Sequence, residues 1–274
     1  MAHPHLLVET DGPVRTITLN NPERLNAQTP SLWAALAEEA EELPADIRVV
    51  VLKGAGDSFS AGIDTALFTP QGLPGEQSVA QLAMAGADAI EEGIANFQRG
   101  FTGWSAVSAV VVAQVRGYAI GAGLQLALAA DLRVVAEDAQ LAMRETSHGI
   151  VPDLGGTKPL VDAVGYARAL EICATGRFVS GLEAGAMGLA NVAVPSVGLE
   201  EATRRLVDRL LSAPDAALRA LKPLLHGAVG ASLEEQAARE RAAQAPLLLG
   251  QVAAARASSV ERTRACGAPM EWGK

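Results

Sequence analysis

This 274-residue chain has few cysteines and few aromatic residues, and it carries no excess of positive charge. Its two cysteines, Cys173 and Cys266, lie far apart and outside any CxxC or His/Cys ligand spacing, so we expect neither a disulfide framework nor a zinc site. The formal net charge is −9 and aromatic residues make up only 4% of the chain. Such a chain offers no basic stripe or aromatic platform to nucleic acid and is repelled by an anionic membrane surface. We therefore expect no nucleic-acid and no membrane partner, and an anionic ligand would need a local basic site.

Long apolar runs are also missing. No stretch reaches the roughly 18 apolar residues that a membrane span requires, and the start MAHPHLLVET lacks the basic and apolar regions of a signal peptide. We therefore expect a cytoplasmic protein. The composition that is present, 49% hydrophobic and 19% charged, is sufficient to bury a substantial core in one globular domain with an appendage.

Strand-like and helix-like patterns alternate along most of the chain. Strands are expected at 5–20, as a hairpin around Asp11-Gly12-Pro13, and at 46–52, 107–115 and 132–136. Helices are expected at 30–43, 124–130 and 160–175. A helix between two strands suggests a parallel crossover, and the alternation predicts an α/β layer fold. Residues 69–103 change character, with PQGLPG followed by an Ala/Glu-rich helical stretch, and we interpret the segment as a variable lid or substrate-side loop.

Beyond Pro195 the pattern becomes helical almost without interruption. Helices are expected at 199–211, 215–228, 233–249 and 251–266. An amphipathic helix must cover its apolar stripe, either on a partner subunit or on its own subunit. We therefore divide the chain into a core domain, residues 1–197, and a C-terminal helical region, residues 198–274, for which we expect a role in oligomerisation.

Two glycine-bearing turns follow strand-like runs, and each precedes an expected helix. The first is FSAGID, residues 59–64, and the second is GYAIGAGLQLALAAD, residues 117–131. Glycine lets another backbone or a ligand approach closely, and a helix N-terminus presents unpaired N–H donors with a favourable dipole. Two such turns could direct two donors at one oxygen. Each turn taken alone also suits plain packing of a helix on a strand, and the GAG triplet lacks the third glycine of a dinucleotide fingerprint.

A third segment, QLAMRETSHGIVPDLGGTKPL at residues 140–160, carries two acidic side chains. Glu145 follows a short strand-like piece, and Asp153 precedes the helix-opening pair Gly155-Gly156. By itself Glu145 is typical of a surface charge, and Asp153 is typical of a helix N-cap. His148 is close to Glu145 in sequence, but without an identified partner we interpret it as a loop histidine.

Taken together, these segments resemble the crotonase superfamily, the enoyl-CoA hydratases and isomerases, over nearly the whole chain. NPERLNAQT resembles the family's early coenzyme A segment, FSAGID its first oxyanion turn and GYAIGAGLQLALAAD its second. AEDAQLAMRETSHGIVPDLGGT resembles the catalytic segment that follows, and the tail APMEWGK resembles the family's terminal sequence. This ordered combination is specific for the superfamily and much less so for the reaction.

The resemblance implies a spiral of ββα units followed by a helical trimerisation region, assembled as a homotrimer or as a hexamer of two trimers. It also implies an acyl-CoA substrate whose thioester oxygen lies between the backbone N–H groups of Ile63 and Ala122. Removal of a proton beside a thioester makes an enolate, and fixed donors in a dry site stabilise that charge by about 3 to 4 kcal/mol each. Coenzyme A is then part of the substrate, so the resemblance implies no separate cofactor and no metal.

The resemblance also implies which residues lie close to the bound substrate. They are Leu25, Ala27, Ala61, Gly62, Asp64, Ile120, Gly121 and Gln125. Arg24 is a candidate phosphate partner because a guanidinium suits that geometry, although an ordinary exposed arginine fits the pattern as well. Asp64 is equally suited to be the N-cap of a helix that begins near Thr65.

The sequence departs from the hydratase pattern at Gln125. Hydratases of the family hold and activate water with two glutamates, at the positions matched by Gln125 and Glu145. An amide can orient water but cannot take its proton, so efficient hydration is in doubt.

The acids that remain favour a different reaction of the same family. Glu145 can move a proton between two carbons of an enolisable acyl chain. Asp153 matches a second acidic position, which dienoyl-CoA isomerases use for proton transfer and chlorobenzoyl-CoA dehalogenases use as a nucleophile. With both acids present, we predict double-bond isomerisation by Glu145 and Asp153. Enoyl-CoA hydration and a non-catalytic acyl-CoA-binding protein on the same fold are the alternatives.

Overall fold

The computed structural model describes residues 3–69 and 71–266. Its contacts divide the chain into two compact units, Met1–Ser212 and Ala213–Lys274. This division lies later than the boundary expected at residue 197, because helix α8 (Leu199–Ser212) packs on the sheet of the first unit. The tail APMEWGK lies outside the described residues.

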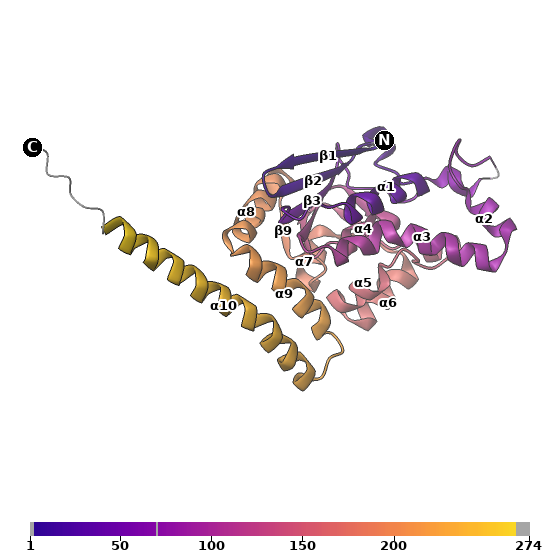
Figure 1. The fold of residues 1–274 in the computed structure, drawn as a ribbon. Helices are drawn as coiled ribbons and strands as arrows, with labels where there is room; N and C mark the ends of the chain where they lie inside the picture. The colour runs from indigo at the N-terminus through magenta and orange to yellow at the C-terminus, as the bar shows by residue number, and fades with distance from the viewer. Residues whose placement is uncertain (1–2, 70, 267–274) are drawn as a thin grey trace, which may run out of the picture. The chain divides into compact units, whose positions relative to one another are not determined.

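A six-stranded sheet forms the centre of the first unit. Its strands are β1 (Leu6–Asp11), β2 (Val14–Leu19), β3 (Val49–Gly54), β4 (Val110–Val115), β6 (Leu132–Ala136) and β9 (Val192–Val194), which follow one another in this order across the sheet. β1 and β2 form the expected antiparallel hairpin, and every other neighbouring pair is parallel. β4 is buried along its whole length, as a strand covered on both faces requires. The predicted α/β class is therefore confirmed (Figure 1).

A second sheet consists of three short strands and lies beside the glycine turns. They are β5 (Tyr118–Ile120), β7 (Gln140–Ala142) and β8 (Val179–Ser180), with β7 in the middle. The first glycine turn joins this sheet, because Ser60 forms a parallel bridge with Ala119 of β5. The chain after β3 and the chain after β4 therefore end up side by side.

Helices surround the two sheets. In the first unit they are α1 (Pro30–Glu41), α2 (Val79–Ala85), α3 (Ala87–Ala106), α4 (Ala122–Ala129), α5 (Thr157–Val164), α6 (Tyr166–Thr175), α7 (Gly181–Met187) and α8, with 3-10 turns η1 (Pro22–Arg24), η2 (Thr65–Phe68), η3 (Glu145–His148) and η4 (Ser196–Gly198). α1 begins behind the N-cap Thr29, whose hydroxyl accepts from the Leu32 N–H. It buries Leu32, Trp33 and Leu36 at helical spacing, each contributing roughly 1.5 to 3 kcal/mol of burial free energy.

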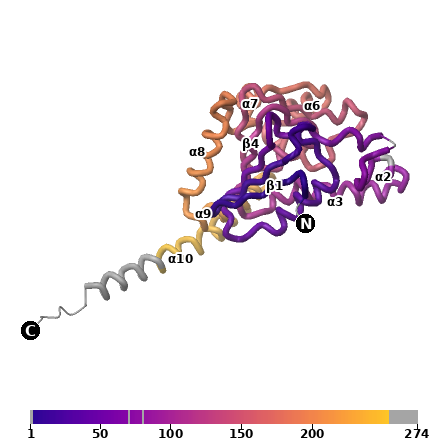
Figure 2. Tube along the Cα trace, turned by 90° about the horizontal axis from the view of Figure 1, so that it is seen from above, coloured from indigo at the N-terminus to yellow at the C-terminus, as the bar shows by residue number. Residues whose placement is uncertain are grey.

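One expectation about the helices of this unit is corrected. The single helix expected at 160–175 is two helices, because Gly165 adopts φ +78° between α5 and α6 and ends the first of them. The helical stretch expected after PQGLPG is found as two helices, since Ser78 and Gln81 form a capping box that starts α2 and α3 follows directly. In both views α2 lies at the periphery of the unit, beyond the beginning of α3 (Figures 1 and 2).

The second unit is a pair of helices, α9 (Asp215–Ala228) and α10 (Leu233–Cys266). The sequence predicts two helices where α10 runs without a break, and the prediction is wrong at Gly250. A glycine costs a helix about 1 kcal/mol relative to alanine but removes no backbone hydrogen bond, so it need not end the helix. Across the described residues no helix is both long enough and apolar enough to cross a membrane.

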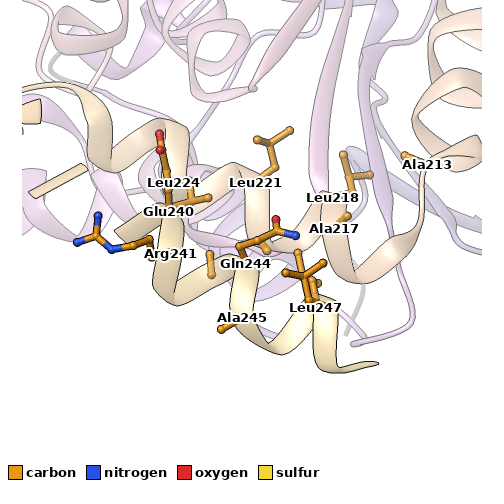
Figure 3. A pocket seen from close by; sticks show the side chains of 13 residues that line it. Ala213, Ala217, Leu218, Leu221, Leu224, Glu240, Arg241, Gln244, Ala245 and Leu247 are labelled. Atoms are coloured by element: carbon orange, nitrogen blue, oxygen red, sulfur yellow. The ribbon is translucent and has the colours of Figure 1, made fainter. Parts of the chain in front are cut away.

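An apolar groove of about 770 Å³ lies between α9 and α10. Figure 3 shows Leu218, Leu221 and Leu224 of α9 lining it together with Gln244 and Leu247 of α10. The pair leaves much apolar surface uncovered, as the 47% exposure of Leu221 shows. The two helices therefore do not satisfy their apolar faces by packing on one another.

Candidate active site

The first glycine turn is held by a parallel bridge that fixes the direction of the Ile63 N–H. The Gln28 N–H donates to the Gly62 carbonyl at 2.8 Å, and the Asp64 N–H donates to the Gln28 carbonyl at 2.8 Å. In such a bridge the residue between the two bonds directs its own N–H and C=O away from the partner. The Ile63 N–H therefore faces away from Gln28, and it has no hydrogen-bond acceptor among the described residues.

A buried polar network supports this turn. Gln28 and Ser60 are both 0% exposed. The Gln28 amide donates to Ser60 Oγ at 3.0 Å and accepts from Trp33 Nε1 at 2.8 Å. Ser60 Oγ donates to the Asn26 carbonyl at 2.8 Å and accepts from the Gly62 N–H at 3.1 Å. A fully satisfied network of this kind favours one conformation, and it leaves Ile63 to supply the unpaired donor of the turn.

The second turn places the Ala122 N–H at the start of α4. Gly121 precedes the helix with φ +53° and ψ −119°, a conformation that favours glycine. Its N–H donates to the Ala142 carbonyl at 2.8 Å and so fixes the turn to β7. As the first residue of the helix, Ala122 has an N–H without an intrahelical acceptor, and no other acceptor occurs in the part of the chain that the structure describes.

The two turns touch one another. A Cβ added at Gly62 would lie 2.5 Å from the Ile120 carbonyl oxygen and 3.5 Å from the Ala122 nitrogen. A Cβ added at Gly123 would lie 2.3 Å from the Ser60 carbonyl oxygen. Side chains cannot approach backbone this closely, so glycine is required at both contacts. The contact allows N–H groups from two distant segments to reach one small region.

The carboxyl group of Glu145 lies against the second turn. Its Oε1 is 3.3 Å from the position that a Cβ would occupy at Gly121. Although its sequence context is typical of a surface charge, Glu145 is only 8% exposed. Oε2 is buried and has no hydrogen-bond partner among the described residues. Burial raises the pKa of Glu145, a hydrogen bond from Gln125 opposes that rise, and the Asp153 carboxylate adds to it. Such a carboxyl is suited to take up and return a proton.

Gln125 joins Glu145 to the loop that carries Asp153. Its side chain is 1% exposed. The amide nitrogen donates to Glu145 Oε1 at 2.8 Å. The amide oxygen accepts from the Leu154 N–H at 2.9 Å and from the Gly156 N–H at 3.2 Å. The amide that the resemblance implies to lie at the ligand is thus engaged with the protein itself.

Asp153 lies in the loop before α5 and does not cap that helix. The N-cap position is Gly156, which has no side chain to cap the helix, and the Gly156 N–H donates to Gln125 instead. The loop is also held from α3, where Gln98 Nε2 donates to the Asp153 carbonyl at 2.6 Å. Burial raises the pKa of Asp153. Because its charge also raises the pKa of Glu145, the fold brings the two predicted catalytic carboxyls within range of one another.

Arg24 and Asp64 form an ion pair beside the first turn. Arg24 Nη2 lies 3.0 Å from Asp64 Oδ1 and 2.9 Å from Oδ2. Asp64 Oδ1 also accepts from the Ala66 N–H, so one of the two roles suggested for this residue, the N-cap of η2, is confirmed. The Arg24 side chain is 57% exposed, which leaves part of its guanidinium accessible to an anion.

The expected coenzyme A segment contacts the first turn through its backbone. The Ala61 N–H donates to the Leu25 carbonyl at 2.9 Å. Leu25 adopts φ +52°, unusual for a residue with a side chain, and is 42% exposed. Ala27, two positions further along the chain, is partly buried. The fold therefore brings these residues together, and their contact with a ligand stays a prediction.

His148 lies on the exposed side of η3. Its ring stacks on Phe68 at the end of η2, with 6.3 Å between ring centres and 13° between ring planes. Within the described residues the imidazole has no hydrogen-bond partner, which agrees with the interpretation as a loop histidine. The described residues also contain no group of three His, Cys, Asp or Glu side chains placed to hold a metal ion.

Sequence reasoning missed the residues that support the first turn. Asn26 is 1% exposed, and its amide donates to the Ala55 and Ser58 carbonyls while its oxygen accepts from the Asn21 N–H. Like Gln28, it is a polar residue inside a motif read for its ligand contacts. The groups to which the two amides donate lie 29 to 32 positions along the chain, so no local pattern reveals these bonds.

The chain matches the family model for enoyl-CoA hydratase/isomerase over residues 9–249. A Mycobacterium bovis protein named as a probable enoyl-CoA hydratase is 31% identical over 246 residues, which cover 88% of each chain. A crystal structure of a protein from Thermobifida fusca YX in complex with CoA, assigned by name to the enoyl-CoA hydratases, is 42% identical with a TM-score of 0.85, covering 90% of this chain and 94% of that one. A second structure of that protein, in complex with acetoacetyl-CoA, has a TM-score of 0.86 at 42% identity and covers 90% and 95%. The crotonase fold with C-terminal helices, which the sequence resemblance implied, is confirmed by these matches.

Proposed function

Since this chain belongs to the enoyl-CoA hydratase/isomerase family, we propose that it binds an acyl-CoA thioester and moves a double bond along the acyl chain through an enolate. One observation carries the proposal: the buried Glu145, with one unpartnered carboxyl oxygen, lies against the turn that presents the Ala122 N–H. The T. fusca relative has been crystallised with CoA and with acetoacetyl-CoA, which supports the substrate class.

The enolate oxygen is bound by the backbone N–H groups of Ile63 and Ala122. Both groups lack an acceptor among the described residues, and the two turns that carry them are in contact. Donors that are already in place require no reorganisation as charge develops, and each contributes about 3 to 4 kcal/mol to the transition state. Because main-chain groups perform this task, both side chains can be apolar.

The coenzyme A part of the substrate lies beside the first turn. Leu25, Ala27 and Ala61 form the surface along which it extends. Arg24 pairs with Asp64 through Nη2, and its side chain is 57% exposed. The rest of its guanidinium can therefore bind a phosphate at the negatively charged nucleotide end. An overall charge of −9 makes such a local cation necessary.

Proton transfer is assigned to Glu145 and Asp153. One carboxylate removes a proton from the carbon next to the thioester, and the electron pair is delocalised onto the thioester oxygen and the neighbouring double bond. A proton is then returned to a carbon farther along the chain. Both carboxyls have a pKa raised by burial, so each can act as base in one step and as acid in the next.

Hydration is the second candidate, because the named relatives are hydratases. It requires a group that takes a proton from water while another returns one to carbon. Gln125 cannot supply the first function, since an amide is not a base at ordinary pH and its oxygen already accepts two backbone hydrogen bonds. A non-catalytic binder, the third reading of the sequence, does not account for a buried carboxyl with a raised pKa beside the turn.

Assays on three thioesters of one chain length test the proposal: a 2-enoyl-CoA, a 3-enoyl-CoA and a 3,5-dienoyl-CoA. We expect the 3-enoyl or dienoyl substrate to be isomerised faster than the 2-enoyl substrate is hydrated. Glu145→Gln should lower that turnover by about 10²- to 10⁴-fold, the usual contribution of a general acid–base group, and Asp153→Asn should lower it too. Fast hydration of the 2-enoyl-CoA that neither substitution affects would contradict the proposal.

The pair α9 and α10 is proposed to assemble the chain into trimers or into hexamers of two trimers. The support is the apolar surface that the pair leaves uncovered: Leu225, Leu248 and Leu249 are 60%, 51% and 72% exposed. Light scattering on the purified protein should give three or six times the chain mass. Leu248→Glu should lower that mass, and a wild-type protein that stays monomeric at micromolar concentration would contradict the assembly.

A further inference from the structure

We infer that Gln125 is a positioning residue that gives the two oxygens of the Glu145 carboxyl group different tasks. It holds Oε1 as a permanent hydrogen-bond acceptor and leaves Oε2 to carry the transferred proton. The assignment of that proton rests on the proposed function, whereas the fixed orientation of the carboxyl does not.

The orientation of the Gln125 amide follows from its neighbours. Its oxygen faces two backbone donors, the Leu154 N–H at 2.9 Å and the Gly156 N–H at 3.2 Å. A flipped amide would place its NH₂ group against both donors and leave three buried groups without acceptors. With 1% of Gln125 exposed, water cannot replace those bonds. The amide nitrogen therefore faces Glu145 and can only donate.

That donor differentiates the oxygens of Glu145. Oε1 accepts from the Gln125 nitrogen at 2.8 Å. A proton on Oε1 that pointed toward Gln125 would clash with this N–H, because the amide nitrogen has no lone pair to accept it. Oε2 is buried and has no hydrogen-bond partner among the described residues. Among the described residues no donor competes for its lone pairs, so Oε2 rather than Oε1 is the oxygen available to hold the transferred proton. Oε1 accepts from Gln125 in both ionisation states.

An amide satisfies this position where a carboxylate would not. A glutamate at 125 could still accept from the two backbone N–H groups, but its second oxygen would lie opposite Glu145 Oε1 in a buried site. Two carboxyls in that arrangement share one proton and titrate as a pair. The amide also fixes the backbone on both sides of Gly155, so one side chain sets the Asp153 loop and the Glu145 carboxyl relative to one another.

The test measures the titration of Glu145 directly, by NMR of the full-length protein labelled with ¹³C at the glutamate side-chain carboxyl. Glu145→Gln identifies the signal. Gln125→Met keeps the length of the side chain and removes its three hydrogen bonds, whereas Gln125→Glu keeps the bonds to the loop and changes only the group that faces Glu145. Gln114→Glu is the matched control. Gln114 lies on β4, outside the site, is 5% exposed, and donates from its amide to Glu200 Oε1 at 3.0 Å.

We expect Gln125→Met to raise the apparent pKa of Glu145 by about one pH unit, because a hydrogen bond that favours the charged form is lost. Gln125→Glu should replace the single titration by two coupled ones, and Gln114→Glu should leave the Glu145 signal unmoved. The pH profile of kcat should shift with the titration, while KM for the acyl-CoA stays within about twofold.

A Glu145 titration that is the same in the Gln125→Glu protein as in the wild type would overturn the inference, and so would an equal shift in Gln114→Glu. If Gln125→Met does not fold, Gln125→Glu alone decides, because the loop keeps its two hydrogen bonds. The titration needs no turnover. The predicted shifts in a protein that isomerises nothing would therefore refute the proposed function and uphold the positioning of Glu145.

Discussion

Replacing Gly62 by alanine tests the contact between the two glycine turns. The added Cβ would lie 2.5 Å from the Ile120 carbonyl oxygen, and Gly62 adopts φ +92°. The opposing atom belongs to the backbone of β5, so it cannot swing aside as the end of a long side chain could. One of the two turns has to move, and the distance between the Ile63 and Ala122 N–H groups changes with it.

The expected magnitude has two parts. Alanine in the left-handed region costs about 1 to 2 kcal/mol of stability. Displacement of one donor from the enolate oxygen costs about 2.7 to 4 kcal/mol of transition-state stabilisation, or 10²- to 10³-fold in kcat. Gly165→Ala separates the two, because Gly165 has φ +78° with no atom within 4 Å of the added Cβ and lies between α5 and α6.

Urea unfolding and kcat for the preferred enoyl-CoA should be measured on both variants and on the wild type. Both variants should lose a similar conformational contribution to the free energy of unfolding. Only Gly62→Ala, at a temperature where it is folded, should lose two orders of magnitude in kcat. If Gly62→Ala retains kcat within about threefold of Gly165→Ala, the close approach of the turns is not what places the donors, and the reasoning fails.

Three further substitutions address other parts of the site. The folded protein holds Glu145 with a raised pKa, so the contribution of this group to stability is fully present below its unfolded-state pKa of about 4.3 and is lost as pH rises through the folded-state pKa. Glu145→Gln should therefore gain stability relative to the wild type as pH rises, by about 1.4 kcal/mol per unit of pKa difference, and urea unfolding that gives a pH-independent difference would contradict this. Ser60→Ala leaves the Gly62 N–H and the Gln28 amide without their buried partner, so the free energy of unfolding should fall by about 1 to 3 kcal/mol; a loss under about 0.5 kcal/mol would show that the network is dispensable. Arg24→Gln should raise KM for an acyl-CoA several-fold and leave KM for the same acyl group on pantetheine unchanged, because pantetheine lacks the nucleotide phosphates; equal changes for both would place the arginine away from the phosphates.

The pattern of residues along the chain predicts those helices and strands that depend mainly on neighbouring residues. The alternation in 14–19 and the turn before it predict the β1–β2 hairpin, and the spacing of Leu32, Trp33 and Leu36 predicts α1 as the crossover to β3. The same pattern does not predict whether a single glycine ends a helix. Gly165 ends a helix through its positive φ, whereas Gly250 continues one, and composition does not distinguish the two.

The candidate site divides in the same way. The structure brings FSAGID into contact with GYAIGAG and buries Glu145, and the roles that the motifs imply for these residues stay predictions. The motifs do not predict which groups Gln125 bonds, because the Leu154 and Gly156 donors become its partners only when the loop folds over α4. The resemblance marks Gln125 as a departure from a hydratase glutamate, and the structure adds that its amide is hydrogen-bonded to Glu145 and to the Asp153 loop.

The most direct measurement is a crystal structure of this protein with a bound acyl-CoA analogue, in which the position of the thioester oxygen is determined. The distances from that oxygen to the Ile63 and Ala122 nitrogens should both be about 2.7 to 3.1 Å, the range of an effective oxyanion donor. A thioester oxygen that is bound by a side chain or by solvent, with neither nitrogen in hydrogen-bond range, would contradict the central claim.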